Sequence, residues 1–310
     1  MFDTIYIELP IQSIKDLDDK SDTIDSETGE VRYSVGFTDC IKIRKVGEVM
    51  TVECSLPKLL KRNNIYSLSF SEVGLALKMI EDKLGISIQQ GIVRRIDCHY
   101  TFETELKVRE YFRYLGDCKY FRRSNIDSDS LYYSNESRVF NFYDKIKEIK
   151  SKRDSIPYEF IGKNIMRCEF RYKTKYLKIM SSKLGIEKLK IENLTDRNTY
   201  NQIAELVYAD YQSITKIRQS YFDEVTISSK AKFQEQFVFA GVMAYGGLNA
   251  VLDKIDASKA LNKNLSPEYF SRRKSEIKNI MKINKQNIEG ECINEINYKI
   301  EQIHLQRLDE

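Results

Sequence analysis

Alternation of apolar and polar residues, repeated in separate segments, is the feature that most restricts what this chain can fold into. It recurs in residues 49–56, 91–102, 138–145 and 164–173. Because successive side chains of a β-strand point to opposite faces of a sheet, each segment has one apolar and one polar face. Antiparallel sheets commonly bury one face and leave the other open to water. We therefore predict an α+β fold, an antiparallel β-sheet with helices on its apolar face.

A carboxylate stands at the centre of three of the polar faces, as Glu53, Asp97 and Glu169. Neighbouring strands lie about 4.8 Å apart, so adjacent strands would bring these carboxylates together. Carboxylates suit Mg²⁺ or Mn²⁺, and His99, on the same face as Asp97, is a further candidate ligand. A half-exposed sheet also gives polar alternation without any site, and an exposed strand histidine suits a phosphate equally well. Both explanations stay open for each strand taken alone.

The segment 138–145 places Tyr143 and Lys145 on one face of a strand, with Val139 and Asn141. One interpretation is a half-buried aromatic side chain whose hydroxyl has a local partner. The other makes Tyr143 a nucleophile and Lys145 the cation that stabilises the phenolate or the anion it attacks. A tyrosine hydroxyl titrates near pH 10, so attack at neutral pH needs a positive neighbour or a base.

Length and hydropathy limit the class of protein. The chain has 310 residues, enough for two domains more readily than one. No apolar run approaches the roughly 18–20 residues that span a bilayer, and the first ten residues lack the features of a signal peptide. We therefore expect a protein of the cytoplasm without a membrane partner. The six cysteines show no paired spacing that indicates zinc or a disulfide framework.

Positive charge is clustered although the net charge is only +4. Basic patches interleaved with tyrosines suit a phosphate backbone and exposed bases, and ordinary solvated side chains are the alternative. The candidate DNA-binding residues are Arg94, Arg95, Arg122, Arg123, Arg171, Lys173, Arg272, Arg273 and Lys274.

The pattern turns helical after about residue 176, and we place a domain boundary near residue 190. Residues 1–190 are the expected domain of the candidate catalytic residues, and 191–310 a helical domain with a DNA-binding or oligomerisation role. Helices are expected over residues 186–194, 200–214, 232–255 and 267–283. The last begins at a serine cap followed by Pro267 and is basic near its start. It is either part of a helix-turn-helix-like DNA reader or an amphipathic helix that closes the domain.

Five sequence blocks carry a family resemblance: MFDTIYIELP, VECSLPKLL, RRIDCHYTF, RRSNIDSDSLYYSNESRVFNFYDK and MRCEFRYKTKYLK. In their order and spacing, residues 1 to about 190 resemble the gene II replication initiators of filamentous phages, a family of phage and plasmid replication proteins. The resemblance implies a metal-dependent enzyme that nicks and rejoins DNA at a specific site in rolling-circle replication. It also implies that Tyr143 is the nucleophile and that Asp97 and Glu169 are the family's acidic strand positions. Glu53 matches a further family glutamate.

The chain departs from many other rolling-circle initiators, which bind metal through a His-hydrophobe-His pair on a strand. Only His99 and His304 are present. Carboxylates, helped by His99, are therefore expected to bind Mg²⁺ or Mn²⁺ here.

The implied reaction is attack of Tyr143 on an origin phosphodiester, which gives a 5′-phosphotyrosine and a free 3′-hydroxyl. Lys145 and Arg167 would offset the charge that builds up on phosphorus. The expected partners are phage or plasmid origin DNA and the host helicase and polymerase. Two alternatives are a non-catalytic origin-binding regulator of replication and a relaxase of plasmid mobilisation.

Overall fold

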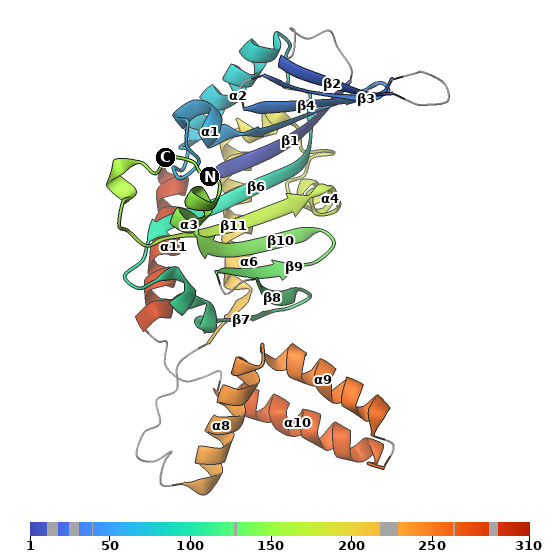
Figure 1. Ribbon diagram of the computed structural model, residues 1–310, viewed down its shortest axis with the longest axis vertical. Coiled ribbons are helices and arrows are strands. Elements are labelled where there is room, and N and C mark those ends of the chain that lie inside the picture. The colour runs from blue at the N-terminus through green and yellow to red at the C-terminus, as the bar shows by residue number, and fades with distance from the viewer. Residues whose placement is uncertain are drawn as a thin grey trace.

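The computed structural model describes residues 1–10, 18–24, 31–38, 40–126, 129–217, 229–262, 264–284 and 291–310. Within them the fold is the expected α+β arrangement, a large antiparallel sheet with helices packed against it (Figure 1). Among the described residues, no helix is both long enough and apolar enough to cross a membrane.

The sheet contains ten described strands in the order β2-β3-β4-β5-β1-β6-β11-β10-β9-β8. Their bounds are β1 Phe2–Pro10, β2 Asp18–Ile24, β3 Val31–Thr38, β4 Ile41–Val46, β5 Val49–Ser55, β6 Ile92–Glu103, β8 Arg122–Ile126, β9 Ser130–Ser134, β10 Arg138–Asp144 and β11 Ile165–Lys173. Two short strands, β7 Leu115–Cys118 and β12 Ile214–Lys216, pair with each other in a second sheet.

The apolar face carries the side chains that the alternation predicts, and they are buried. Cys98, Tyr100, Phe140 and Phe170 are inaccessible to solvent. The helices α2 Phe70–Leu84, α6 Arg197–Gln212 and α11 Glu291–Asp309 contribute buried side chains to the same core, as does the short α5 Ile191–Leu194. Figure 1 shows α6 and α11 behind the central strands. Their packing leaves the other face of the sheet for polar groups.

Three helices begin directly where strands end: α1 Leu56–Lys61 after β5, α3 Lys145–Ser151 after β10, and α4 Thr174–Lys183 after β11. Two 3-10 helices, η1 Val108–Tyr114 and η2 Tyr158–Phe160, lie in the connections. The carboxylate of Asp144 caps α3 by accepting a hydrogen bond from the Lys147 amide at 3.0 Å. Lys145 is therefore the first residue of a helix, where we had expected it in the strand with Tyr143.

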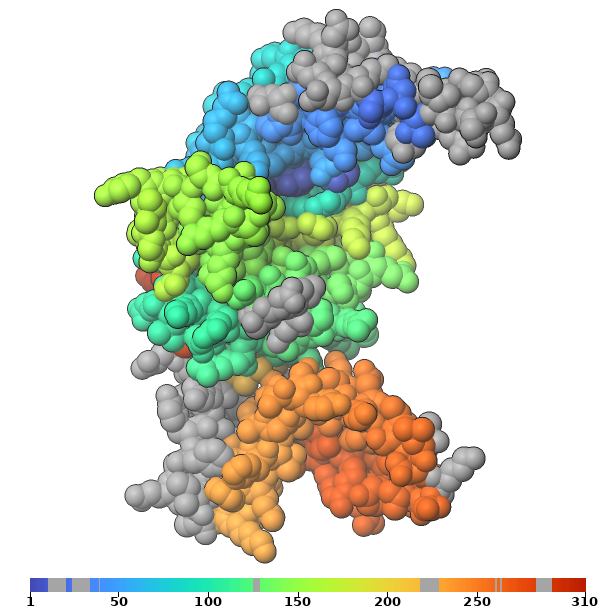
Figure 2. Space-filling model, viewed as in Figure 1, coloured from blue at the N-terminus to red at the C-terminus, as the bar shows by residue number. Residues whose placement is uncertain are grey.

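The helices α8 Lys230–Ala244, α9 Leu248–Leu261 and α10 Pro267–Asn284 form a group with its own small apolar cluster of Phe239, Val242 and Met281. In Figure 2 the surface of this group lies below the surface of the sheet. The single helix expected over 232–255 is wrong. Gly246 and Gly247 have φ angles of 110° and 95°, which a continuous helix does not allow, so the chain breaks there.

The sheet core extends past residue 190, because residues of α5, α6 and α11 belong to it. The helices that pack apart from this core are α8–α10. The acidic and turn-rich sequence of residues 16–30 predicts a solvated loop, but residues 18–24 form a strand. Within the helix expected over residues 186–194, only Ile191–Leu194 is helical. The remainder of the expected 16–30 loop, at residues 16–17 and 25–30, lies outside the described residues.

Candidate active site

One cross-strand row on the polar face joins β10, β11 and β6. Tyr143 is opposite Arg167, and Arg167 is opposite Thr101. Arg167 is completely buried, with its Nε donating to Thr101 Oγ1 and its Nη1 donating to Asp3 Oδ2, both at 2.9 Å. Its Nη2 donates to the carbonyl of Asn64, in the loop between α1 and α2. Arg167 is thus enclosed by protein groups beside Tyr143.

The next row along the same strands contains Asn141, Glu169 and His99. Tyr143 donates its hydroxyl to Glu169 Oε2 at 3.2 Å, and Arg171 Nη2 donates to the other carboxylate oxygen at 3.0 Å. Glu169 is therefore shared between the tyrosine and an arginine.

Tyr143, Asn141, Glu169 and Arg171 line a pocket of about 480 Å³, whereas His99 is fully buried beside it. Tyr143 has 8% of its surface exposed. The side chains that line the pocket include Tyr132, Asn141, Tyr143, Glu148, Glu169 and Arg171. Tyr143, which bonds Glu169, thus lies at the wall of this pocket.

Electrostatics keep Tyr143 protonated. Burial raises its pKa well above the usual value, and the negative charge of Glu169 raises it further, while Arg167 opposes the shift. The pKa of Glu169 is also raised, first by burial and then by Asp97 and Asp3. A carboxylate with a raised pKa is a better proton acceptor, and this one already accepts the tyrosine hydrogen bond.

Lys145 lies next to the ring of Tyr143. Its Nζ is 5.9 Å from the centre of the tyrosine ring and donates to Asn64 Oδ1 at 2.9 Å and Glu148 Oε2 at 2.7 Å. The side chain is fully buried, and burial followed by the charge of Arg167 lowers its pKa to about 8. Lys145 is therefore a cation that can lose its proton in a mildly alkaline medium.

Asp97 is buried and held by two arginines. Arg95 Nε donates to Oδ1 at 2.8 Å, and Arg171 Nε donates to Oδ2 at 3.2 Å. Burial raises the pKa of Asp97 although both arginines oppose the shift. The carboxylate expected as a metal ligand is thus engaged in ion pairs.

Glu53 lies away from the other two carboxylates. It is opposite Tyr6 of β1, and Tyr6 is opposite Arg95 of β6, so a whole strand separates Glu53 from β6. Burial and a hydrogen bond to Glu53 raise the pKa of Tyr6 to about 12. The expected meeting of three carboxylates is wrong in this respect, because β1 is inserted between β5 and β6.

The donors around Glu169 fit a divalent cation. In the described part of the chain, no three His, Cys, Asp or Glu side chains are grouped to hold a metal. Yet His99 Nε2 and Asn141 Oδ1, on either side of Glu169 in the row, are buried without a hydrogen-bond partner among those residues. Burial lowers the pKa of His99 well below its usual value, which leaves the imidazole neutral as metal binding requires. An amide oxygen, a carboxylate and a neutral imidazole are ligands that Mn²⁺ accepts.

Sequence reasoning missed Asp3, Asn64 and Asn141. Asn141 was already assigned to the face of Tyr143, and its position next to Glu169 was the available signal. Asp3 stands near the start of β1, where the pairing with β6 shifts register between Phe2 and Ile5, so alternation does not assign its face. Asn64 is in a loop, whose path over the sheet no periodicity reveals.

Two of the candidate DNA-binding arginines, Arg122 and Arg123, separate on β8. Arg122 is exposed. Arg123 donates to the carbonyls of Leu115 and Phe112, both at 3.1 Å, and so connects β8 to η1 and the start of β7. Adjacent strand residues point to opposite faces, which explains the difference.

The candidates on β6 and β11 line the polar face beyond Asp97. Arg94 donates to Glu8 through Nε at 2.9 Å, and Arg95 stacks on the ring of Tyr6 at 4.9 Å. Lys173 is directly opposite Arg95. This end of the face is basic, although most of its arginines are engaged in ion pairs.

The basic residues of α10 differ in accessibility. Arg272 and Arg273 are exposed, and Arg273 donates to Glu276 at 2.7 Å. Lys274 is paired with Asp256 of α9. Two of the three basic residues, Arg273 and Lys274, are therefore paired with acidic residues of α10 and α9, and Arg272 is exposed.

A comparison with protein families identifies the family of this chain. Residues 1–195 match the family model that describes the N-terminal region of the gene II replication-associated protein. No curated protein matched the sequence. The matched range contains Asp3, Asp97 and both cross-strand rows of polar residues on β10, β11 and β6. The chain therefore belongs to the family of replication-associated proteins defined by the gene II protein N-terminal domain.

Proposed function

We propose that this protein nicks and rejoins origin DNA to initiate rolling-circle replication, with Tyr143 as the nucleophile. The observation that carries the proposal is the hydrogen bond from the Tyr143 hydroxyl to Glu169, at the wall of a pocket on the polar face of the sheet. Glu169 is half-buried and its pKa is raised, so this carboxylate is suited to accept the proton of the hydroxyl that it already bonds.

The first step transfers a proton and exchanges one ester for another. Glu169 Oε2 takes the proton of the Tyr143 hydroxyl while the phenolic oxygen bonds to phosphorus. The bond from phosphorus to the 3′-oxygen breaks, and that oxygen leaves with the electron pair and is protonated by water. The products are a 5′-phosphotyrosine and a 3′-hydroxyl from which a host polymerase extends. Rejoining is the reverse, which needs no nucleotide cofactor because the phosphotyrosine keeps the ester bond.

Positive charge around the tyrosine favours the transition state. Arg171 lines the pocket beside Glu169 and is able to offset charge on the phosphoryl oxygens directly. Lys145 is buried and bonded to Asn64 and Glu148, so its positive charge would act on the phosphoryl group from beneath the pocket wall rather than by contact. Arg167 is buried under Asn64 and bonded to Asp3, so its role is to position Tyr143 and Thr101 rather than to contact the phosphate.

A divalent cation fits beside this group, with Glu169, Asn141 and His99 as its protein ligands. Its chemistry would be to withdraw charge from the phosphoryl group and to hold it in line with the attacking oxygen. The use of an imidazole favours Mn²⁺ over Mg²⁺, which prefers oxygen ligands and keeps much of its water.

The test is nicking of supercoiled DNA that carries the protein's own origin, with Mg²⁺ or Mn²⁺. Tyr143→Phe should abolish nicking and leave origin binding unchanged. Tyr132→Phe is the matched control, because Tyr132 lines the same pocket on β9. It should nick at the rate of the unmodified protein.

Other outcomes assign other functions. Nicking that survives in Tyr143→Phe and is lost in Tyr132→Phe would move the nucleophile to β9. Binding of the origin without nicking under any metal would favour the regulator. Nicking at a transfer origin and not at a replication origin would favour the mobilisation relaxase.

A further inference from the structure

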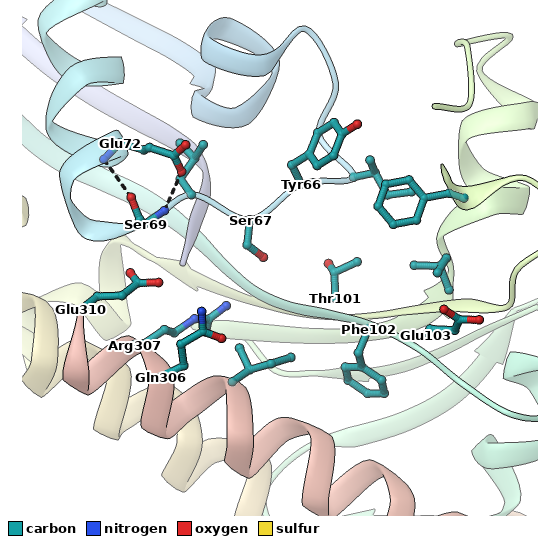
Figure 3. Close-up of a pocket in the computed structure, with 15 residues that line it drawn as sticks. Tyr66, Ser67, Ser69, Glu72, Thr101, Phe102, Glu103, Gln306, Arg307 and Glu310 are labelled. Atoms are coloured by element: carbon teal, nitrogen blue, oxygen red, sulfur yellow. Dashed lines mark hydrogen bonds between the residues drawn. The ribbon is translucent and has the colours of Figure 1, made fainter. Parts of the chain in front are cut away.

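A second pocket, of about 400 Å³, lies at the end of β6 where the sheet meets α11. Its size is within the roughly 300–1,000 Å³ of small-molecule sites. In Figure 3 the loop that carries Tyr66, Ser67 and Ser69 passes above it, Thr101 points into it from β6, and Arg307 approaches from α11. Two further aromatic side chains, Phe102 and Phe160, line the pocket.

We infer that this pocket binds one unstacked base of the DNA strand next to the nick. The inference rests on the proposed function and adds a subsite to it.

Arg307 indicates that a ligand supplies a hydrogen-bond acceptor. Its side chain is 3% exposed and stacks over the ring of Tyr100 at 4.5 Å. Nη2 donates to the carbonyl of His99, but Nη1 is buried without a hydrogen-bond partner in the described part of the chain. A buried guanidinium N–H without an acceptor is costly, so an acceptor from a ligand would be stabilising.

The rest of the lining favours a base over a phosphate. A phosphate offers acceptors only, and the carboxylates of Glu72, Glu103 and Glu310, which line the same pocket, would repel it. The edge of a base offers donors and acceptors together, which suits Arg307 beside these carboxylates and the amide of Gln306. The rings of Tyr66 and Phe160 meet edge to face at 5.7 Å and provide an apolar wall for stacking.

The position of Thr101 connects this pocket to the candidate nicking site. Thr101 lines the pocket, and its hydroxyl accepts a hydrogen bond from Arg167 and contacts His99 Nδ1 at 2.9 Å. Thr101 and Tyr143 are in one cross-strand row with β11 between them. At about 4.8 Å per strand, they are about 10 Å apart, short enough for a nucleotide close to the scissile phosphate. An extruded base there would fix the register of the strand over Tyr143.

The experiment uses the full chain with Tyr143→Phe, so that binding is measured without nicking. Single-stranded oligonucleotides that span the origin nick, each with 5-iododeoxyuridine at one position, are irradiated with the protein, and the linked residue is identified by mass spectrometry. We expect one position to link to Tyr66, Phe102 or Phe160. Links confined to the polar face or to α8–α10 would overturn the inference.

Affinity measurements with variants give a second readout. Tyr66→Ala should weaken binding of the oligonucleotide roughly five- to a hundredfold, the effect of losing one stacked base. Tyr66→Phe, which keeps the ring, should bind within about twofold of the parent, as should Tyr298→Ala, an exposed residue of α11 outside the pocket. Gln306→Ala, at an exposed position, should weaken binding as well and guards against a folding defect of Tyr66→Ala.

An abasic nucleotide at the linked position should weaken binding by the parent and cause no further loss in Tyr66→Ala. Losses that simply add would contradict the inference, because independent sites are additive. Coupling in the Tyr143→Phe background, together with no nicking by the unmodified protein under any metal, would support the base site and reject the proposed function. Nicking without coupling would do the opposite.

Discussion

The ion pair between Asp3 and Arg167 gives the sharpest prediction about what holds the polar face together. The two side chains are 5% and 0% exposed, and Nη1 lies 2.9 Å from Oδ2. In Asp3→Ala the guanidinium of Arg167 would remain buried and lose the carboxylate that it bonds, keeping its hydrogen bonds to the neutral oxygens of Thr101 and Asn64. Breaking a buried pair from one side costs about 3–5 kcal/mol, because a charge is left without compensation.

We therefore expect Asp3→Ala to lower the free energy of unfolding by about 3–5 kcal/mol. The assay is urea denaturation at neutral pH, followed by far-UV circular dichroism and extrapolated linearly to water. Asp154→Ala is the control, because it breaks a pair with Lys58 whose side chains are 34% and 42% exposed. Exposed pairs contribute about 0–1 kcal/mol.

The double variant Asp3→Leu with Arg167→Met removes both charges and should recover most of the lost stability. It should not recover nicking, since Arg167 no longer positions Tyr143. A loss of less than about 1 kcal/mol in Asp3→Ala would refute the reasoning, because it would mean that Arg167 is not an uncompensated buried charge.

Three further predictions concern charge, metal and DNA. Because the pKa of Lys145 is about 8, single-turnover nicking should slow as pH rises through that value, and Lys145→Met should remove this descending limb. The pKa of the same lysine is 10.5 in the unfolded chain, so between about pH 8 and 10.5 the unfolded state binds more protons than the folded state. Over this pH range the free energy of unfolding, measured by denaturant titration, should rise with pH for the unmodified protein relative to Lys145→Met. By calorimetry, His99→Ala and Asn141→Ala should each weaken Mn²⁺ binding at least tenfold, whereas Glu53→Gln should not; equal effects of all three would contradict the ligand set. In Arg122→Ala the slope of the logarithm of the DNA-binding constant against the logarithm of the salt concentration should become shallower by about 1, the effect of losing one phosphate contact. An unchanged slope would exclude Arg122 from the interface.

Alternation predicted the faces of the central strands because one face of each strand carries apolar side chains throughout and the other carries polar ones. The row of Asn141, Glu169 and His99 follows from it once the register is known. Alternation does not predict the order of strands in the sheet, because the apolar and polar pattern of β1 is compatible with any position in it. For that reason Glu53 was grouped with carboxylates that lie on the far side of β1.

Helical periodicity was less informative in the second half of the chain. The pair Gly246–Gly247 is a signal for a break that the prediction of one helix over 232–255 did not use. The helix α11 was not predicted, although Ile293, Ile296 and Ile300 have helical spacing and are fully buried in the sheet core. That such a late segment returns to pack beside α6 is decided by tertiary contacts, which local periodicity does not contain.

The most direct test of the central claim is the identity of the residue that becomes bonded to DNA. The protein is incubated with its origin DNA and Mn²⁺, denatured, and digested with nuclease and protease, and the modified peptide is sequenced by mass spectrometry. We predict a nucleotide attached through its 5′-phosphate to Tyr143. A nucleotide attached to any other residue, or a nicked circle without attached protein, would contradict the account.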